Sequence, residues 1–126
     1  MSKNIGIDLG SSTALMYLSQ SGKIVKEPSV VAVDEVSGKI LAAGSDAEIL
    51  CGRIPGAAKI IYPFRAGMGV ENKYFSFFIA YMLKKAEIKG PFHPNLIFCM
   101  SADISEEDEN RIYDIVHRTE LRMLWL

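Results

Sequence analysis

The chain has 126 residues, of which 49% are hydrophobic, and its formal net charge is -1. This length suits one domain with a buried core, and the balanced charge argues against a nucleic-acid-binding surface or a basic membrane-binding face. No apolar stretch is long enough to span a bilayer, and the strand pattern begins by Asn4, so we expect no signal peptide and a cytoplasmic protein. Cys51 and Cys99 both lie among apolar residues, and we expect them to be buried, reduced thiols.

The first predicted element is a pair of strands joined by a tight turn. Apolar residues occupy 5–9 and 15–18, with Gly10 and three hydroxyl-bearing residues at 11–13 between them. This pattern is typical of strand, turn and strand. Asp8 interrupts the first apolar run, where a carboxylate is costly to bury unless a cation or hydrogen-bond donors meet it.

The turn has the chemistry of an anion site. Gly10 lets the backbone approach a ligand closely, and the amides and hydroxyls of Ser11, Ser12 and Thr13 can point into one concavity. Magnesium that is carried by phosphates needs few protein ligands, so the single carboxylate of Asp8 would suffice. The alternative is a polar hairpin turn in which Asp8 is a structural carboxylate.

The next third of the chain predicts further strands and one short helix. Pro28 fits only the start or the edge of a strand. Ser45 or Asp46 can cap the short helix. In order, we expect strands at 23–26, 29–34 and 39–43, the helix through Cys51, and an extended run at 58–63 that precedes a turn at 65–69.

The last part of the chain alternates helices and strands. Residues 73–87 carry apolar side chains at the spacing of a buried helix face, namely Phe75, Phe78, Ile79, Met82 and Leu83. Residues 95–100 are almost continuously apolar, which is typical of a central strand covered on both faces. Ser105 can cap a helix whose inward residues are Ile112, Ile115 and Val116, and residues 121–126 predict a final strand.

This order predicts an α/β fold. A β-meander followed by βαβ crossovers gives a mixed sheet with helices packed on its faces. Ligands of such sheets bind at the carboxyl ends of the strands. Asp8 and the turn after it lie at such an end.

Six motifs give the chain a clear resemblance to the MreB family of bacterial actins along nearly its whole length. The most specific of them are EPSVVAVD and GRIPG. The motifs are IDLG at 7–10, EPSVVAVD at 27–34, GRIPG at 52–56, YMLKK at 81–85, NLIFCM at 95–100 and SEED at 105–108. The resemblance implies the first half of the actin-like ATPase fold, which is ribonuclease H-like, with residues 1–126 forming the N-terminal part and a small subdomain inserted at about 35–60.

The resemblance also implies an ATP site with Mg²⁺. The family pattern DLGTANT corresponds to Asp8 and the turn, so that Gly10, Ser11, Ser12 and Thr13 would contact the nucleotide. Asp8 would act on the metal through a bound water. Ala14 replaces a threonine of the family pattern and removes one polar contact.

A second implied site is catalytic. In the family a T-E-x-E helix carries a glutamate that positions the attacking water, and Asp108 occupies that place. Its shorter side chain would hold the water about one methylene too far back, so hydrolysis is a weaker expectation than binding. A purely structural role for Asp108 in capping its helix remains the alternative. Ala66 also replaces a family aspartate.

The remaining implications concern assembly and the membrane. Members of this family polymerise beneath the membrane and guide the cell-wall synthesis machinery, which sets the rod shape. We therefore expect self-association into filaments and no nucleic-acid partner. Some relatives bind the membrane through an apolar loop, and Pro91 and Phe92 lie at that place, so peripheral membrane contact is expected only for a polymer.

Relatives continue into a second half that completes the nucleotide cleft. Residues 1–126 would then supply one wall of the site and bind ATP weakly or not at all alone, as a truncated copy or as part of a longer product. A different hypothesis is a non-catalytic copy that interacts with filaments of a full-length relative. A third, a kinase or chaperone fragment of the same fold, is disfavoured by EPSVVAVD.

Overall fold

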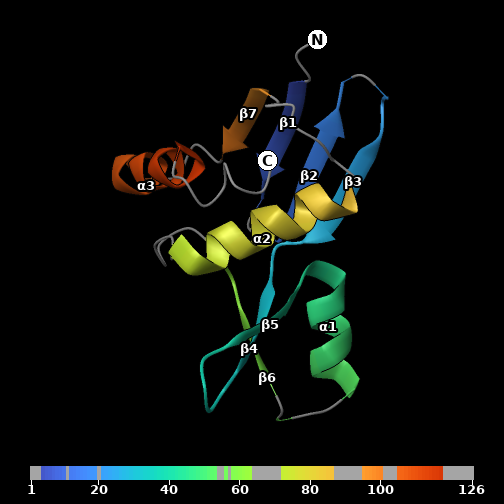
Figure 1. Cartoon of the computed structure of the whole chain (residues 1–126), viewed down its shortest axis with the longest axis vertical. Coiled ribbons are helices and arrows are strands. Elements are labelled where there is room, and N and C mark those ends of the chain that lie inside the picture. Colours follow the sequence, from blue (N-terminus) through green and yellow to red (C-terminus); the bar gives the residue numbers. More distant parts are fainter. Residues whose placement is uncertain are drawn as a thin grey trace.

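The computed structural model describes residues 4–10, 12–19, 21–53, 56, 58–63, 72–86, 95–100 and 105–117. Strands dominate the first half of the chain and helices alternate with strands in the second (Figure 1). The elements are β1 Asn4–Leu9, β2 Thr13–Leu18, β3 Ile24–Pro28, β4 Val31–Asp34, β5 Ile40–Ala43, α1 Gly44–Arg53, β6 Ala58–Ile61, α2 Asn72–Lys85, β7 Asn95–Met100 and α3 Glu106–His117.

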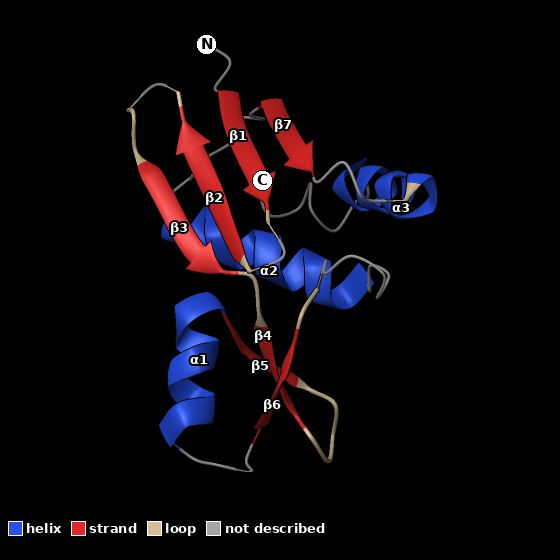
Figure 2. Cartoon of the chain, turned by 180° about the vertical axis from the view of Figure 1, so that it is seen from behind, coloured by secondary structure: helices blue, strands red, loops and turns tan. Residues whose placement is uncertain are grey.

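The larger sheet has the strand order β3-β2-β1-β7. β1 is antiparallel to β2 and parallel to β7, with Ile5 opposite Leu18 on one side and Leu96 on the other. The parallel pair is joined through a connection that contains α2, and this helix lies across one face of the sheet (Figure 2). The structure confirms the predicted mixed sheet, in which an early strand lies beside the one at Leu96.

A second, smaller sheet has the order β5-β4-β6 and packs against α1. The sequence predicted one mixed sheet, whereas the structure divides the strands between two. Only Ser29 and Val30 separate β3 from β4, so the chain passes from one sheet to the other within this short connection. Hydrophobic alternation identifies strands but does not say which sheet each strand joins, because that depends on long-range pairing.

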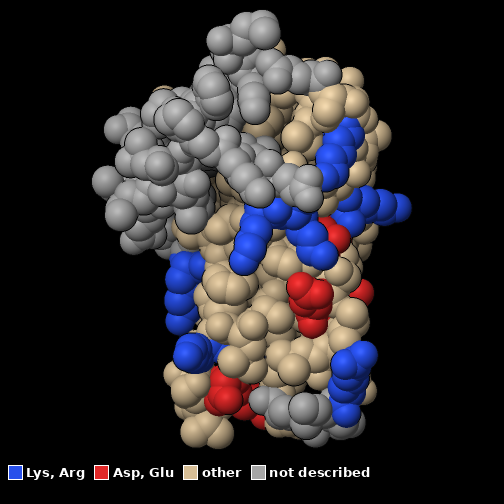
Figure 3. Space-filling model, turned by 45° about the vertical axis from the view of Figure 1, so that its right-hand side comes forward, with Lys and Arg blue, Asp and Glu red and all other residues tan. Residues whose placement is uncertain are grey.

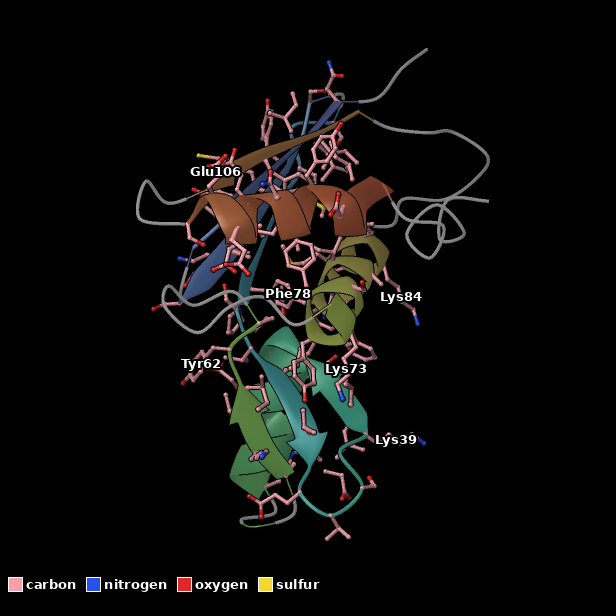
Figure 4. The ribbon with its side chains drawn as sticks, turned by 90° about the vertical axis from the view of Figure 1, so that its left-hand side faces the viewer. Lys39, Tyr62, Lys73, Phe78, Lys84 and Glu106 are labelled. Carbon is pink, nitrogen blue, oxygen red and sulfur yellow. The ribbon has the colours of Figure 1, made fainter. Side chains whose placement is uncertain are left out.

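The core lies between α2 and the larger sheet. The predicted helix stripe is confirmed, since Phe75, Phe78, Ile79, Met82 and Leu83 are all buried. Their partners on the sheet include Ile5, Ile7, Leu9, Ala14, Met16 and Val25. Each fully buried side chain of this size contributes about 1.5–3 kcal/mol through removal of apolar surface from water. On α2, the side chain of Lys84 extends away from the helix, whereas Phe78 on the same helix is buried (Figure 4).

The other face of the larger sheet is open in the described part of the chain. Ile97 of β7 is 61% exposed and Cys99 is exposed, because strand residues alternate between the two faces. The prediction that this strand is central and covered on both faces is therefore wrong for the described residues, among which β7 lies at the sheet edge. The prediction of two buried thiols is wrong as well, since Cys51 is only partly buried.

Charged side chains are mixed on the surface. On the face shown in Figure 3, lysines and arginines lie among acidic residues. Among the described helices, none combines the length and apolar character needed to cross a membrane. The turn predicted at 65–69 and the strand predicted at 121–126 lie outside the described residues.

Candidate functional site

The hydroxyl-rich turn follows β1 at the end of the larger sheet that faces the smaller sheet (Figures 1 and 2). Asp8 lies one residue from the end of β1, on the open face, and is exposed. Water therefore solvates this carboxylate, which needs no cation or hydrogen-bond donor to offset burial. Its neighbours across the sheet are Leu15 on β2 and Cys99 on β7.

Ser29 ties the turn to the start of the second sheet. Its hydroxyl donates a hydrogen bond of 2.8 Å to the Gly10 carbonyl oxygen, and its amide donates one of 2.9 Å to the Ser12 carbonyl oxygen. The residue is 1% exposed, so neither bond competes with bulk water. The two carbonyl oxygens that flank residue 11 are thus bonded to one buried serine.

Gly10 is required by close packing within the turn. A Cβ atom at this position would overlap the carbonyl oxygen of Thr13. Any larger residue would therefore have to open the turn. Of the four turn residues that the sequence assigned to nucleotide contact, Gly10, Ser12 and Thr13 lie together here, and Ser11 lies outside the described residues.

Asp108 lies in the first turn of α3 and is partly buried. Its amide donates a 3.0 Å hydrogen bond to the Ser105 hydroxyl, which confirms Ser105 as the helix cap. Since β1 and β7 are parallel and Leu9 lies beside Met100, the two strands end side by side at the end of the sheet where the turn begins. The membrane-loop residues Pro91 and Phe92 lie outside the described residues.

A second polar cluster surrounds Glu27, two residues before Ser29. Its Oε1 atom accepts hydrogen bonds from the Ser45 amide at 2.9 Å, the Ser45 hydroxyl at 3.0 Å and the Tyr81 hydroxyl at 2.8 Å. The cluster joins β3, the first turn of α1 and α2. The predicted cap of α1 by Ser45 or Asp46 is therefore replaced: the helix begins at Gly44 and a carboxylate from β3 meets its N-terminal amide.

These contacts shift the pKa values of Glu27 and Tyr81. Burial by itself raises the pKa of Glu27, but hydrogen bonds from the Ser45 amide, the Tyr81 hydroxyl and the Ser45 hydroxyl, together with the charge of Lys85, lower it overall below 4.5. Burial and the neighbouring Glu27 carboxylate raise the pKa of Tyr81 to about 12, against the opposing hydrogen bond with Ser45. Glu27 is thus ionised and Tyr81 neutral at physiological pH.

The motif EPSVVAVD carried the resemblance, but the roles of its first and third residues were not predicted from the sequence. Glu27 and Ser29 directly precede the apolar residues 30–33, and both are buried. A buried carboxylate and a buried serine need hydrogen-bond partners. The sequence could therefore have predicted that Glu27 and Ser29 have hydrogen-bond partners, but not that these partners are Tyr81 and Gly10.

The profile of the MreB/Mbl protein family matches residues 2–122. The chain belongs to the MreB/Mbl family. It is 30% identical over 125 residues to the cell shape-determining protein Mbl of Bacillus cereus, and equally to that of Bacillus subtilis, covering 98% of this chain and 38% of each relative. This MreB/Mbl chain thus spans about two fifths of the length of these relatives.

Solved structures show the same fold. MreB5 of Spiroplasma citri bound to AMPPNP superposes with a TM-score of 0.76 at 17% identity, covering 91% of this chain and 35% of that one. The non-polymerising A278D mutant of MamK bound to AMPPNP gives a TM-score of 0.75, covering 91% of this chain and 37% of that one. These likenesses confirm the predicted actin-like fold for the MreB/Mbl chain.

Proposed function

We propose that this chain supplies the phosphate-binding wall of an ATP site in an MreB-like bacterial actin. The observation that carries the proposal is the hydroxyl-rich turn after β1, whose carbonyls are bonded to Ser29, in a chain of the MreB/Mbl family. Support comes from the nucleotides in the structures with this fold, which are AMPPNP and ADP.

The proposed roles follow from position. The turn residues Gly10, Ser11, Ser12 and Thr13 would meet the phosphates through amides and hydroxyls. Asp8 fits a magnesium ion carried by those phosphates, because its carboxylate is exposed near the end of β1 and such an ion keeps several waters. The metal would neutralise phosphate charge, and Asp8 would orient it through one of its waters.

For hydrolysis we propose Asp108 as the residue that orients the attacking water. It lies on α3, the helix that follows β7 in the chain, and the carboxyl end of β7 lies beside the carboxyl end of β1, from which the turn begins. Its short side chain makes slow hydrolysis the expected behaviour. A capping role alone is the competing interpretation.

On the scale of the assembled protein, we propose a filament that lies beneath the membrane and directs cell-wall synthesis to maintain a rod shape. The names of the relatives, which are cell shape-determining proteins, support this proposal. The smaller sheet with α1 would be the inserted subdomain expected at about 35–60, and Pro91 and Phe92 would contact the membrane once a polymer provides avidity.

The test is a chimaera in which residues 1–126 replace the matching segment of Bacillus subtilis Mbl, which supplies the rest of the cleft. We expect this chimaera to bind Mg²⁺·AMPPNP, and a Ser12→Ala, Thr13→Ala double variant to lose at least tenfold in affinity. Ser37→Ala, in the exposed turn between β4 and β5, is the matched control and should bind like the parent. Equal affinity in all three proteins would contradict the proposal.

A second function, interaction with filaments of a full-length relative, is favoured by the open sheet face. Tyr17 is 49%, Ile24 is 62% and Ile97 is 61% exposed there, and they form one row with Gly6 across four strands. Such an apolar row is typical of a surface that docks another element. Co-sedimentation of the 126-residue chain with polymers of Bacillus subtilis Mbl tests it, and a Tyr17→Lys, Ile24→Lys variant should remain in the supernatant.

A further inference from the structure

Ser29 is the one described residue that bonds to the turn from both sides of residue 11. Its side chain meets the Gly10 carbonyl oxygen and its own amide meets the Ser12 carbonyl oxygen. Ser29 also begins the connection that leads from β3 to the smaller sheet, and it is 1% exposed. A buried serine that uses both its donors on one turn fixes the orientation of that turn.

The orientation matters for an anion. A carbonyl oxygen carries partial negative charge and an amide N–H partial positive charge, so a phosphate is favoured where N–H groups face it and carbonyls do not. The peptide unit between Ser12 and Thr13 is planar and trans, so its N–H points opposite to its carbonyl. Since the Ser12 carbonyl faces Ser29, the Thr13 N–H points away from Ser29.

We propose that Ser29 is the positioning residue of the phosphate turn. By bonding to the carbonyls of Gly10 and Ser12, it turns two repelling oxygens away from the anion and presents the Thr13 amide to it. This inference rests on the proposed nucleotide function, which the turn residues carry. Ser29 touches no substrate itself and acts through the turn.

The test uses the whole chain labelled with ¹⁵N. Ser29→Ala removes the hydroxyl, and Ser29→Cys keeps the size of the side chain with a weaker donor, which guards against loss of the fold. Ser45→Ala is the matched control, because it also deletes a partly buried serine hydroxyl that bonds across elements, but it does so at Glu27 rather than at the turn. Two quantities are measured: amide hydrogen exchange of Gly10, Ser12 and Thr13 in this chain without ligand, and the affinity for Mg²⁺·AMPPNP of the Bacillus subtilis Mbl chimaera that carries each substitution.

We expect both Ser29 variants to exchange the turn amides about tenfold faster than the Ser45 control and to bind AMPPNP about tenfold more weakly than it does. Turn exchange equal to that of the control overturns the positioning role. Faster exchange with unchanged AMPPNP affinity also overturns it, because Ser29 would then serve only the fold. If the parent chimaera does not bind AMPPNP while the Ser29 variants still exchange faster, positioning is supported and the nucleotide function fails.

Discussion

The hydroxyl of Tyr81 on α2 lies 2.8 Å from Oε1 of Glu27 on β3, and it donates its hydrogen bond to the same oxygen that accepts the amide of the first turn of α1. One carboxylate oxygen therefore joins the helix on the larger sheet to the helix on the smaller sheet. Glu27 is 9% exposed, so loss of one of its donors is not readily replaced by water.

Tyr81→Phe should lower the free energy of unfolding by about 1.5–3 kcal/mol, the usual contribution of a hydrogen bond to a charged group. Urea denaturation followed by circular dichroism measures it. Tyr17→Phe is the matched control, because Tyr17 lies half exposed on the open sheet face and the same atom is removed. A loss as large in the control as in Tyr81→Phe would show that the cluster is not the cause.

The stability of the protein should depend on pH at both ends of the scale through the same pair. The folded pKa of Glu27 is lowered, so its stabilising contribution is present above its unfolded pKa near 4.5 and is lost as the pH falls through the lower folded value. The folded pKa of Tyr81 is raised to about 12, so its contribution is present below pH 10 and is lost as the pH rises toward that value. The free energy of unfolding, measured against pH, should fall less steeply at acid pH in Glu27→Gln and less steeply at alkaline pH in Tyr81→Phe than in the parent protein.

Gly44→Ala should destabilise the protein more than a positive φ alone explains. Gly44 has φ +58, and an added Cβ would overlap Oε1 of Glu27 and lie 2.6 Å from the ring of Tyr81. Gly22→Ala is the matched control, since its φ is +71 but a Cβ there meets nothing within 4 Å. We expect about 1–2 kcal/mol in the control from the backbone conformation, and about 1–3 kcal/mol more at Gly44 from overpacking. Equal losses by thermal or urea unfolding would exclude the steric cause.

Gly10→Ala should damage the turn itself. Its Cβ would overlap the Thr13 carbonyl oxygen, so the turn has to open, at about 1–3 kcal/mol of stability. In the Bacillus subtilis Mbl chimaera we expect AMPPNP binding to fall below detection. Gly6→Ala on β1, the strand that leads into the turn, should retain binding, because an added Cβ there meets nothing within 4 Å. Retained affinity in Gly10→Ala would speak against a nucleotide at this turn.

On the proposed role of Asp108 in orienting the attacking water, Asp108→Glu should restore the reach that the shorter side chain lacks. In the chimaera we expect phosphate release from ATP to rise about tenfold to a hundredfold, because a displacement of this size affects how the attacking water is aligned. Glu109→Asp, one residue on in the same helix turn, is the control for a changed acidic side chain. An unchanged rate of phosphate release in Asp108→Glu would show that Asp108 has only a structural role in the first turn of α3.

The sequence predicted most secondary structure because each signal is local. The apolar stripe from Phe75 to Leu83 repeats at the helix period, and Ser105 caps α3 through its own side chain. It was wrong about β7, since a continuous apolar run looks the same whether one face or both are covered. The exposures of Ile97 and Cys99 depend on what packs on the sheet from elsewhere in the chain.

The candidate site divides in the same way. The turn at Gly10 could be found from its small and hydroxyl-bearing residues, and the family from motifs such as EPSVVAVD. The hydrogen-bond partners of Glu27 and Ser29 in that motif could not be predicted. Ser29 lies 19 residues from Gly10, and Glu27 lies 54 residues from Tyr81. Local chemistry thus determined the strands, helices and turn, whereas only the tertiary structure decided which buried polar groups meet. Hydrogen bonds between distant residues are selected by the packing of whole elements, and no spacing in the sequence encodes that packing.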